Sequence, residues 1–386
     1  MANLEYLKAK TAEYAVVLFR LNKELQTLGS KKVEHQWLVN YLQGQLEEAQ
    51  TLHKLLESIV EIGHSRLLPR ALPIIHDIEF STFIINYYYL PALQKESQAD
   101  LALRKLLLLS AKRCGLFWLQ DIAVTLNGQL ATLPNPPEAP LIFAPPQLAV
   151  SLLEMPGLYH ELGHDVFQKI HEIAENLGTS IHLYFNELRQ KSGPITPERK
   201  IERNQQFDQA VQYWDTKRLN EIFCDIFGTF ACGAAHYISC VDMGLRSGHD
   251  PFDVDFGDEH PPLSARVYAC YKTLTPNQQN EQSVITIGCA WENYKKAYTQ
   301  EYNFNLICSE ALLDRIVKVA IDNIQNFMPN SHRYEVSLPD NGQIHEIPLD
   351  VSLEDLLNRA AHILLTCPEC YEAWEAKAFK ILGFCD

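Results

Sequence analysis

The sequence predicts a mainly α-helical protein. Apolar residues recur at spacings of three and four over most of the chain, which is the period of an amphipathic helix. A period of two, typical of a half-buried strand, appears after residue 330. Prolines gather near residue 140 and interrupt the helical pattern there. With 386 residues, the chain is long enough for two or three domains, each with a core of its own.

The first predicted domain, residues 1–132, is all-helical. Apolar stripes run through residues 3–28 and 33–62, and Gly29 stands between them, so we expect an antiparallel helical hairpin. Further helical patterns follow over residues 71–93 and 98–125.

The second predicted domain covers residues 133–330 and begins in the proline-rich segment. Six prolines between residues 134 and 146 exclude a helix there, because proline lacks the backbone donor and restricts the residue before it. Residues 141–143 are expected to form a short strand, and residues 244–262 a long acidic loop. Helices are predicted over residues 149–176, where Gly178 is expected to end the helix, and over residues 180–190, 197–236, 263–274, 282–301 and 309–327.

The third predicted part, residues 331–386, is a small C-terminal extension. Alternating residues at 334–338 and 344–349 flank a Pro-Asp-Asn-Gly turn, which predicts a β-hairpin. Two helices, over residues 352–365 and 369–382, are expected to close the chain.

The charge and cysteine content limit the function classes. The chain has 33 basic and 48 acidic residues, a net charge of −15, which disfavours non-specific nucleic-acid binding. No apolar run is long enough to span a membrane, and the first residues lack the pattern of a signal peptide. The ten cysteines follow no disulfide framework. A cytoplasmic protein without a membrane span is therefore expected.

The segment LYHELGHDVF carries the strongest chemical signal, because it contains His160, Glu161 and His164. Residues four apart lie on one face of a helix, so both imidazoles can reach a single zinc ion. Glu161 can act on the water in the open coordination position as a general base. Apolar neighbours indicate that this helix is buried, where its histidines and glutamate need a partner to offset desolvation.

The third metal ligand is predicted on a later helix. His171 is unsuitable, because without a helix break it lies about 10.5 Å along the axis from His164. Glu221 is the better candidate, and Asp225 follows it by one helical turn on a strongly apolar helix. Asp225 would accept the N–H of a ligand histidine and fix the orientation of its ring.

These motifs resemble those of the gluzincins, the zinc peptidases typified by thermolysin. The following segment DEHPPLSARV, residues 258–267, is similar to the His-Pro-x-x-x-x-Arg element of the CAAX prenyl endopeptidases and their stress-response relatives. His260 and Arg266 match the histidine and arginine of that element. The resemblance covers residues 150–270, less than a third of the chain, and does not extend to the membrane-embedded segments common in that family. A prenylated substrate is therefore not implied.

The resemblance implies a zincin-like catalytic domain with one zinc ion per chain on His160, His164 and Glu221. It further implies that His260 stabilises the oxyanion and that Arg266 organises the site or Asp225. The expected function is hydrolysis of peptide bonds in a protein or peptide substrate, and the strand at residues 141–143 could offer an edge to that substrate.

Two other functions stay open. The chain could be a non-catalytic scaffold with a zincin fold that recruits a protein partner through the N-terminal helices, or a metallohydrolase that cleaves a non-peptide amide. A second metal site also stays open, because Cys367 and Cys370 have zinc-knuckle spacing but only His362 and Cys385 near them in sequence.

Overall fold

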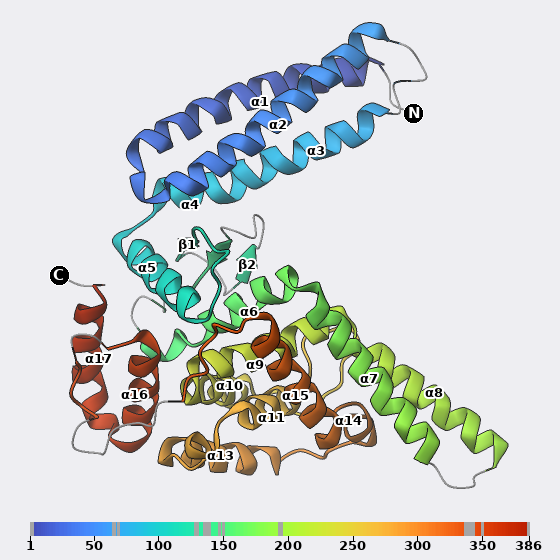
Figure 1. Cartoon of the computed structure of the whole chain (residues 1–386), viewed down its shortest axis with the longest axis vertical. Coiled ribbons are helices and arrows are strands. Elements are labelled where there is room, and N and C mark those ends of the chain that lie inside the picture. The colour runs from blue at the N-terminus through green and yellow to red at the C-terminus, as the bar shows by residue number, and fades with distance from the viewer. Residues whose placement is uncertain are drawn as a thin grey trace.

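The computed structural model describes residues 4–63, 67, 70–126, 131–133, 140–145, 148, 151–191, 196–335, 344–348 and 351–383. Within these ranges the protein is mainly helical, as predicted, and contains one small sheet (Figure 1). Within the described part of the chain, no helix is both long enough and apolar enough to cross a bilayer.

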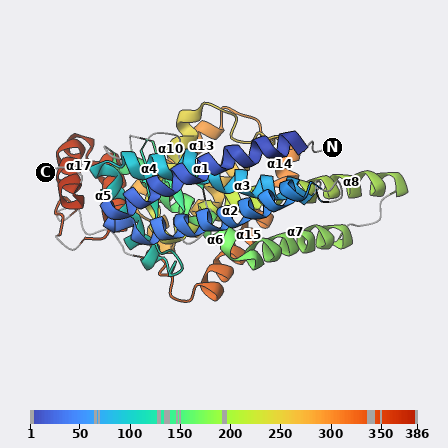
Figure 2. The same ribbon diagram turned by 90° about the horizontal axis from the view of Figure 1, so that it is seen from above.

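The N-terminal helices form a long antiparallel bundle (Figures 1 and 2), and Figure 1 shows that it stands apart from most of the molecule. The bundle contains α1 (Leu4–Lys31), α2 (Gln36–Ile62) and α3 (Ala71–Ile84), and α3 continues through a π-helical turn (Ile85–Tyr89) into α4 (Leu90–Lys95). Leucines from α1 and α2 fill its core, which confirms the predicted helical hairpin. The short connection Val33–His35 joins these two helices.

Helix α5 (Gln98–Arg113) begins at a capping box formed by Ser97 and Asp100. The predicted helix over residues 98–125 is too long, because the chain turns at Gly115, whose φ is 79°. A Cβ at Gly115 would also lie 3.1 Å from the backbone nitrogen of Ser331, so a larger residue does not fit. A strand follows instead of more helix.

The sheet has three strands in the order β1-β3-β2. Strand β3 (Leu141–Phe143) is parallel to β1 (Ala123–Thr125) and antiparallel to β2 (Ala131–Leu133). The strand predicted at residues 141–143 is therefore confirmed, but it is central and has no free edge for a substrate. Strands β1 and β2 also correct the prediction that residues 1–132 are all-helical.

The helices of the middle region are shorter and more numerous than predicted. The helix expected over residues 149–176 ends at Lys169, and the next helix runs through Gly178 instead of ending there. The helix expected over residues 197–236 is broken by the N-cap Asp215 and by Gly233, whose φ is 71°. The resulting helices are α6 (Gly157–Lys169), α7 (His171–Lys191), α8 (Pro197–Tyr213), α9 (Thr216–Cys232) and α10 (Ala234–Ser247).

The remaining helices are α11 (Leu263–Thr273), α12 (Pro276–Gln279), α13 (Gln282–Lys295), α14 (Tyr302–Ile307), α15 (Glu310–Phe327), α16 (Leu353–Thr366) and α17 (Pro368–Leu382). Four of them, α11, α15, α16 and α17, follow the prediction closely, whereas α13 ends before residue 301 and the short helices α12 and α14 were not predicted. The predicted β-hairpin falls largely on residues 336–343 and 349–350, which lie outside the described residues, and residues 331–335 and 344–348 contain no strand.

The buried residues form one core around α6 and α9 and another in the N-terminal bundle, with a smaller cluster around α10 and α13. Ala123 and Leu141 of the sheet belong to the core of the bundle, whereas α5, α16 and α17 pack on the core of the middle region. The division into domains at residues 132 and 330 stays a prediction.

Candidate metal centre

Helices α6 and α9 cross at close range and bring the predicted residues together. A Cβ on Gly163 of α6 would lie 2.9 Å from the backbone Cα of Cys224 on α9, so only glycine allows this approach. Buried apolar side chains on both helices, including Leu162 and Ile222, fill the contact. His160, His164, Glu221 and Asp225 therefore project from two closely packed helices.

Three imidazole rings converge on the Glu221 carboxylate. His160 Nε2 and His260 Nε2 lie 3.3 and 3.4 Å from Glu221 Oε2. His164 Nε2 lies 3.7 Å from the other oxygen, Oε1. The rings of His160 and His164 are perpendicular, with centroids 4.9 Å apart.

Glu221 Oε2 is buried and accepts no hydrogen bond from any described residue, despite the three nearby rings. A buried carboxylate oxygen without a donor is costly, and such atoms usually have a partner. Zinc ligands about 2.0–2.1 Å from the ion in a tetrahedral site lie about 3.4 Å from each other, which is close to the observed separations. Each of His160 and His164 thus lies at a distance from Glu221 at which the two residues could share a cation.

Asp225 and Arg266 fix the orientation of the His160 ring through its Nδ1 atom, which faces away from Glu221. Its Nδ1 lies 3.0 Å from Asp225 Oδ1, and Arg266 donates to both oxygens of Asp225 over 2.6 and 2.9 Å. Burial alone would raise the pKa of Asp225, but the Arg266 guanidinium holds it well below its usual range. Burial also opposes protonation of His160, yet the hydrogen bond to Asp225 and the nearby Glu221 carboxylate raise its pKa to about 10.

His164 has a different partner, which the sequence did not reveal. Its Nδ1 lies 3.3 Å from Cys224 Sγ, and the Cys224 thiol donates to Asn220 Oδ1 over 3.4 Å. Burial raises the pKa of Cys224 well above its ordinary value, so the side chain stays a thiol. Burial lowers the pKa of His164, and a positive charge on His160 lowers it further. Because Asn220 and Cys224 are one helical turn apart, their pairing could have been inferred, but not their contact with α6.

Glu161 lies on α6 between the two histidines and is 5% exposed. Its carboxylate is close enough for its negative charge to raise the pKa of His164.

His260 reaches the site from the loop between α10 and α11. Asp258 Oδ1 accepts from both the backbone N–H and Nδ1 of His260, each over 2.9 Å, which turns Nε2 toward Glu221. Arg218, buried on α9, donates to the backbone carbonyls of Asp255 and Phe256 in the same loop. An aspartate two residues before a histidine is a recognisable turn signal, whereas nothing in the sequence indicates the role of Arg218.

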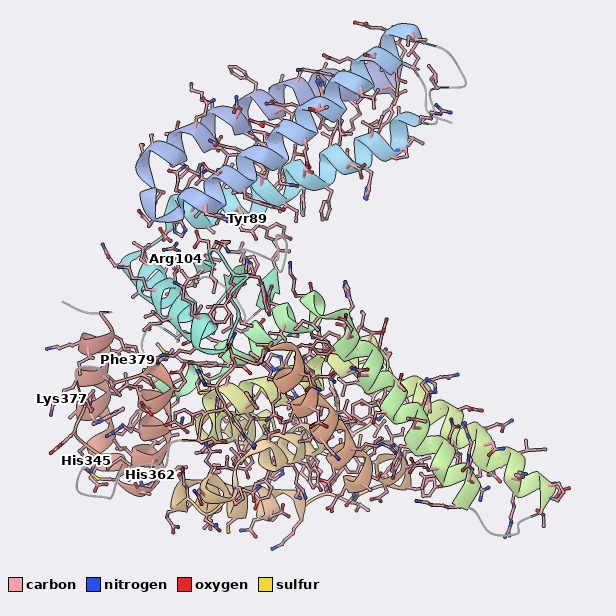
Figure 3. All side chains as sticks on the ribbon, viewed as in Figure 1. Tyr89, Arg104, His345, His362, Lys377 and Phe379 are labelled. Carbon is pink, nitrogen blue, oxygen red and sulfur yellow. A yellow bond between two sulfur atoms is a disulfide. The ribbon has the colours of Figure 1, made fainter. Side chains whose placement is uncertain are left out.

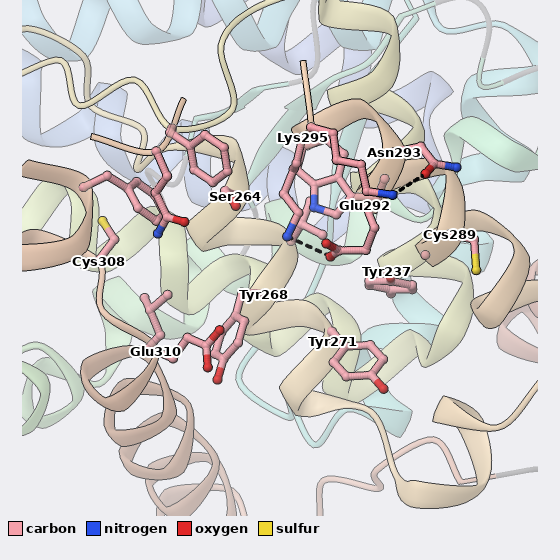
Figure 4. A pocket seen from close by; sticks show the side chains of 18 of the residues that line it. Tyr237, Ser264, Tyr268, Tyr271, Cys289, Glu292, Asn293, Lys295, Cys308 and Glu310 are labelled. Carbon is pink, nitrogen blue, oxygen red and sulfur yellow. Dashed lines mark hydrogen bonds and ion pairs between the residues drawn. The ribbon is translucent and has the colours of Figure 1, made fainter. Parts of the chain in front are cut away.

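A cavity of about 920 Å³ is lined in part by aromatic side chains of α11 and α13 (Figure 4). Tyr268 and Tyr271 of α11 contribute to its wall, as does Trp291. None of the predicted site residues lines it, so the cavity and the metal centre are separate places that share α11.

Six of the predicted site residues thus meet at the junction of α6, α9 and α11 with the loop before α11, and Glu161 is buried beside His160 on α6. No protein-family model matches the chain, and neither a curated protein nor a solved structure shows significant similarity to it.

Proposed function

We propose that the chain is a zinc-dependent metallopeptidase that holds one zinc ion on His160, His164 and Glu221. The observation that supports this most strongly is the buried Glu221 Oε2, which lies near the Nε2 atoms of His160 and His260 and has no hydrogen bond from a described residue. Two imidazoles and a carboxylate form a donor set typical of catalytic zinc, which keeps one coordination position open.

Glu221 is a better third ligand than Cys224, although Cys224 Sγ also lies near both rings. The Nδ1 atom of His160 faces Asp225, and the Nδ1 atom of His164 faces Cys224. Both rings therefore turn their Nε2 atoms toward the Glu221 carboxylate. Cys224 contacts the Nδ1 atom of His164 and orients its ring, as partners of metal-ligating histidines usually do.

A zinc ion in this position would act as a Lewis acid that makes water more acidic and polarises a carbonyl group. Glu161 would accept the proton of the attacking water and pass it to the leaving amine. His260 would donate from Nε2 to the oxyanion that develops on the substrate.

A cation at this site must compete with a proton. The pKa of His160 is raised to about 10, and only the neutral ring can ligate through Nε2. Zinc binding would therefore release a proton, and the apparent affinity would increase with pH below that value.

An extended peptide would have an edge strand close to the zinc site. Strand β2 contacts α6, and its outer edge pairs with no other strand in the described ranges. A substrate strand could add there through main-chain hydrogen bonds. We therefore propose β2, and not the central strand β3, as the edge that receives the substrate.

The protein partner at the N-terminal helices and the cytoplasmic location belong to the same proposal. Val16 and Phe19 of α1 are 69% and 74% exposed, so the bundle presents apolar side chains to solvent. Such side chains are suitable contacts for a protein partner.

Glu161→Gln provides the test of catalysis. The variant should keep its zinc and lose at least about 10²-fold of the turnover of a peptide library, because the amide cannot accept the proton. Glu172→Gln, a matched change of an exposed glutamate on α7, should leave turnover unchanged.

Each alternative has its own outcome in this experiment. Zinc-loaded wild-type protein that cleaves no peptide would contradict the peptidase proposal and favour the scaffold. Hydrolysis of non-peptide amides alone, sensitive to Glu161→Gln, would favour the other metallohydrolase. Full activity of Glu161→Gln would remove Glu161 from the role of base.

A further inference from the structure

A second group of metal-ligating side chains lies in the C-terminal extension, apart from the centre described above. One donor atom each from His345, Cys367 and Cys370 lies within 4.8 Å of the others. His345 comes from the segment before α16, whereas the two cysteines begin α17. The fold therefore adds an imidazole to a Cys-x-x-Cys pair from a part of the chain that the motif does not include.

The two sulfur atoms are held at the start of α17. Cys367 is the N-cap residue, Pro368 occupies the first turn, and Cys370 completes that turn. The structure records the two cysteines as a disulfide, so they are close enough to bind one ion when reduced. Glu369 Oε1 lies 3.1 Å from Cys367 Sγ and adds negative charge to this group.

His345 is positioned by contacts on both sides. Arg359 of α16 donates to the backbone carbonyls of Ile344 and Glu346 over 3.3 and 2.9 Å. Ile344 is 3% exposed and packs into the main core. The backbone of His345 is therefore fixed beside the cysteines, although the side chain itself is exposed.

A second histidine nearby lacks a hydrogen bond. His362 of α16 is 8% exposed, and its Nδ1 has no partner among the described residues. Burial lowers the pKa of His362, and the proximity of His345 lowers it further. Both histidines lie at the same end of the α16–α17 pair (Figure 3).

We propose that Cys367, Cys370 and His345 form a second zinc site in the reduced protein, with His362 or water as the fourth ligand. Two thiolates and an imidazole are a soft donor set that suits zinc and differs from the two imidazoles and carboxylate of the first centre. Binding replaces the two thiol protons, and the disulfide form has no thiolates with which to bind. The ion connects residues 344–348 to the α16–α17 pair and is structural.

The experiment counts zinc in full-length protein purified under reducing conditions. Wild type should hold two zinc ions per chain, and the double variant Cys367→Ser and Cys370→Ser should hold one. His345→Ala should lower the affinity for the second zinc ion by more than about tenfold, since the variant loses a direct ligand. Competition with a chromophoric chelator measures this affinity. Cys289→Ser, which removes an exposed free cysteine, should still hold two ions.

Cobalt distinguishes this site from the first centre. Cobalt-loaded wild type should show a thiolate-to-cobalt charge-transfer band that persists in the double variant His160→Ala and His164→Ala and disappears in the double cysteine variant. That pattern supports the second site even when the first centre proves to bind no metal.

Two results would overturn the second site. One is a single zinc ion per chain in reduced, folded wild type, with that ion lost in the His160 and His164 variant. The other is a second ion whose affinity His345→Ala leaves unchanged. Because His345 is exposed, its alanine variant should fold normally, which circular dichroism would verify, and it keeps the test valid even when the cysteine variant misfolds.

Discussion

At the scale of single residues, Asp225 connects the metal ligands to the interior. It contacts His160 on one side and receives two hydrogen bonds from Arg266 on the other. A charge this deeply buried needs its partner, because the low dielectric of the interior penalises an unpaired ion more than it rewards a pair. The Asp225–Arg266 pair therefore supports both the stability of the core and the orientation of His160.

Arg266→Ala should lower the free energy of unfolding by about 3 kcal/mol or more, since Asp225 loses its principal partner. Arg315→Ala is the matched control, because Arg315 pairs with Glu187 at the surface over 3.0 Å and should contribute less than about 1 kcal/mol. Chemical denaturation followed by circular dichroism measures both. Equal losses of unfolding free energy in the two variants would contradict the role of Arg266 as the principal partner of Asp225.

The sequence predicts which site residues share a helix, because Glu221 and Asp225 are four apart, as are His160 and His164. It does not predict the partners of these residues on other elements. The sequence pattern indicates only that Cys224 is a small core residue. Its contact with His164 depends on how α6 crosses α9. Arg218 holds the loop that carries His260 through backbone carbonyls, which leave no sequence pattern.

At the scale of elements, the existence of helices is predictable and their ends are less so. The apolar stripe continues across Asp215 and Gly233, so periodicity alone merges α8, α9 and α10 into one helix. The N-cap at Asp215 and the positive φ at Gly233 end the helices. Gly178 was expected to end a helix, but it lies inside α7 with open space around it. A glycine inside a helix costs only about 1 kcal/mol, which packing can outweigh.

Two glycine-to-alanine changes test the close approach of α6 and α9. Gly163→Ala should destabilise the protein, because a Cβ 2.9 Å from the Cys224 backbone forces the helices apart at a cost of about 1–3 kcal/mol. It should also weaken zinc binding, since the ligands lie on both helices.

The control for that change is Gly178→Ala, where a Cβ meets nothing within 4 Å. This variant should be more stable than wild type by about 1 kcal/mol, because alanine favours the helix. Thermal unfolding of both variants is the measurement. A stabilising Gly163→Ala would show that the two helices do not need this contact.

At the scale of the whole molecule, a buried charge cluster joins the N-terminal bundle to the rest. His35 is fully buried between Glu96 and Asp121, over 2.5 and 3.2 Å. Arg104 of α5 donates to Asp121 over 2.7 Å and to the carbonyl of Glu34 over 2.6 Å. Arg104 and Tyr89 lie where the bundle meets α5 and the sheet (Figure 3). The sequence contains no local signal for this junction, because its members are far apart along the chain.

The His35 junction should make stability depend on pH. Burial lowers the pKa of His35, but hydrogen bonds to Asp121 and Glu96 outweigh it and raise the pKa above its ordinary value of 6.5. A group whose pKa is higher in the folded state than in the unfolded state stabilises the protein at pH values below its unfolded-state pKa. This contribution disappears as the pH rises through the folded-state pKa.

His35→Gln should therefore be less stable than wild type by at least about 2 kcal/mol at pH 6, because it loses hydrogen bonds to two charged groups. The difference should decrease as the pH is raised toward 10. His182→Gln, at an exposed position on α7, should show no difference beyond about 0.5 kcal/mol at either pH. Urea denaturation at a series of pH values provides the data, and a difference that grows with pH would contradict the charged state of His35.

The zinc site itself is best tested by anomalous X-ray scattering from crystals of full-length protein expressed with zinc. Data on both sides of the zinc absorption edge should give a peak about 2.0–2.2 Å from His160 Nε2, His164 Nε2 and an oxygen of Glu221. A crystal in which these three side chains still face one another, but in which no anomalous peak lies between them, would contradict a zinc site there.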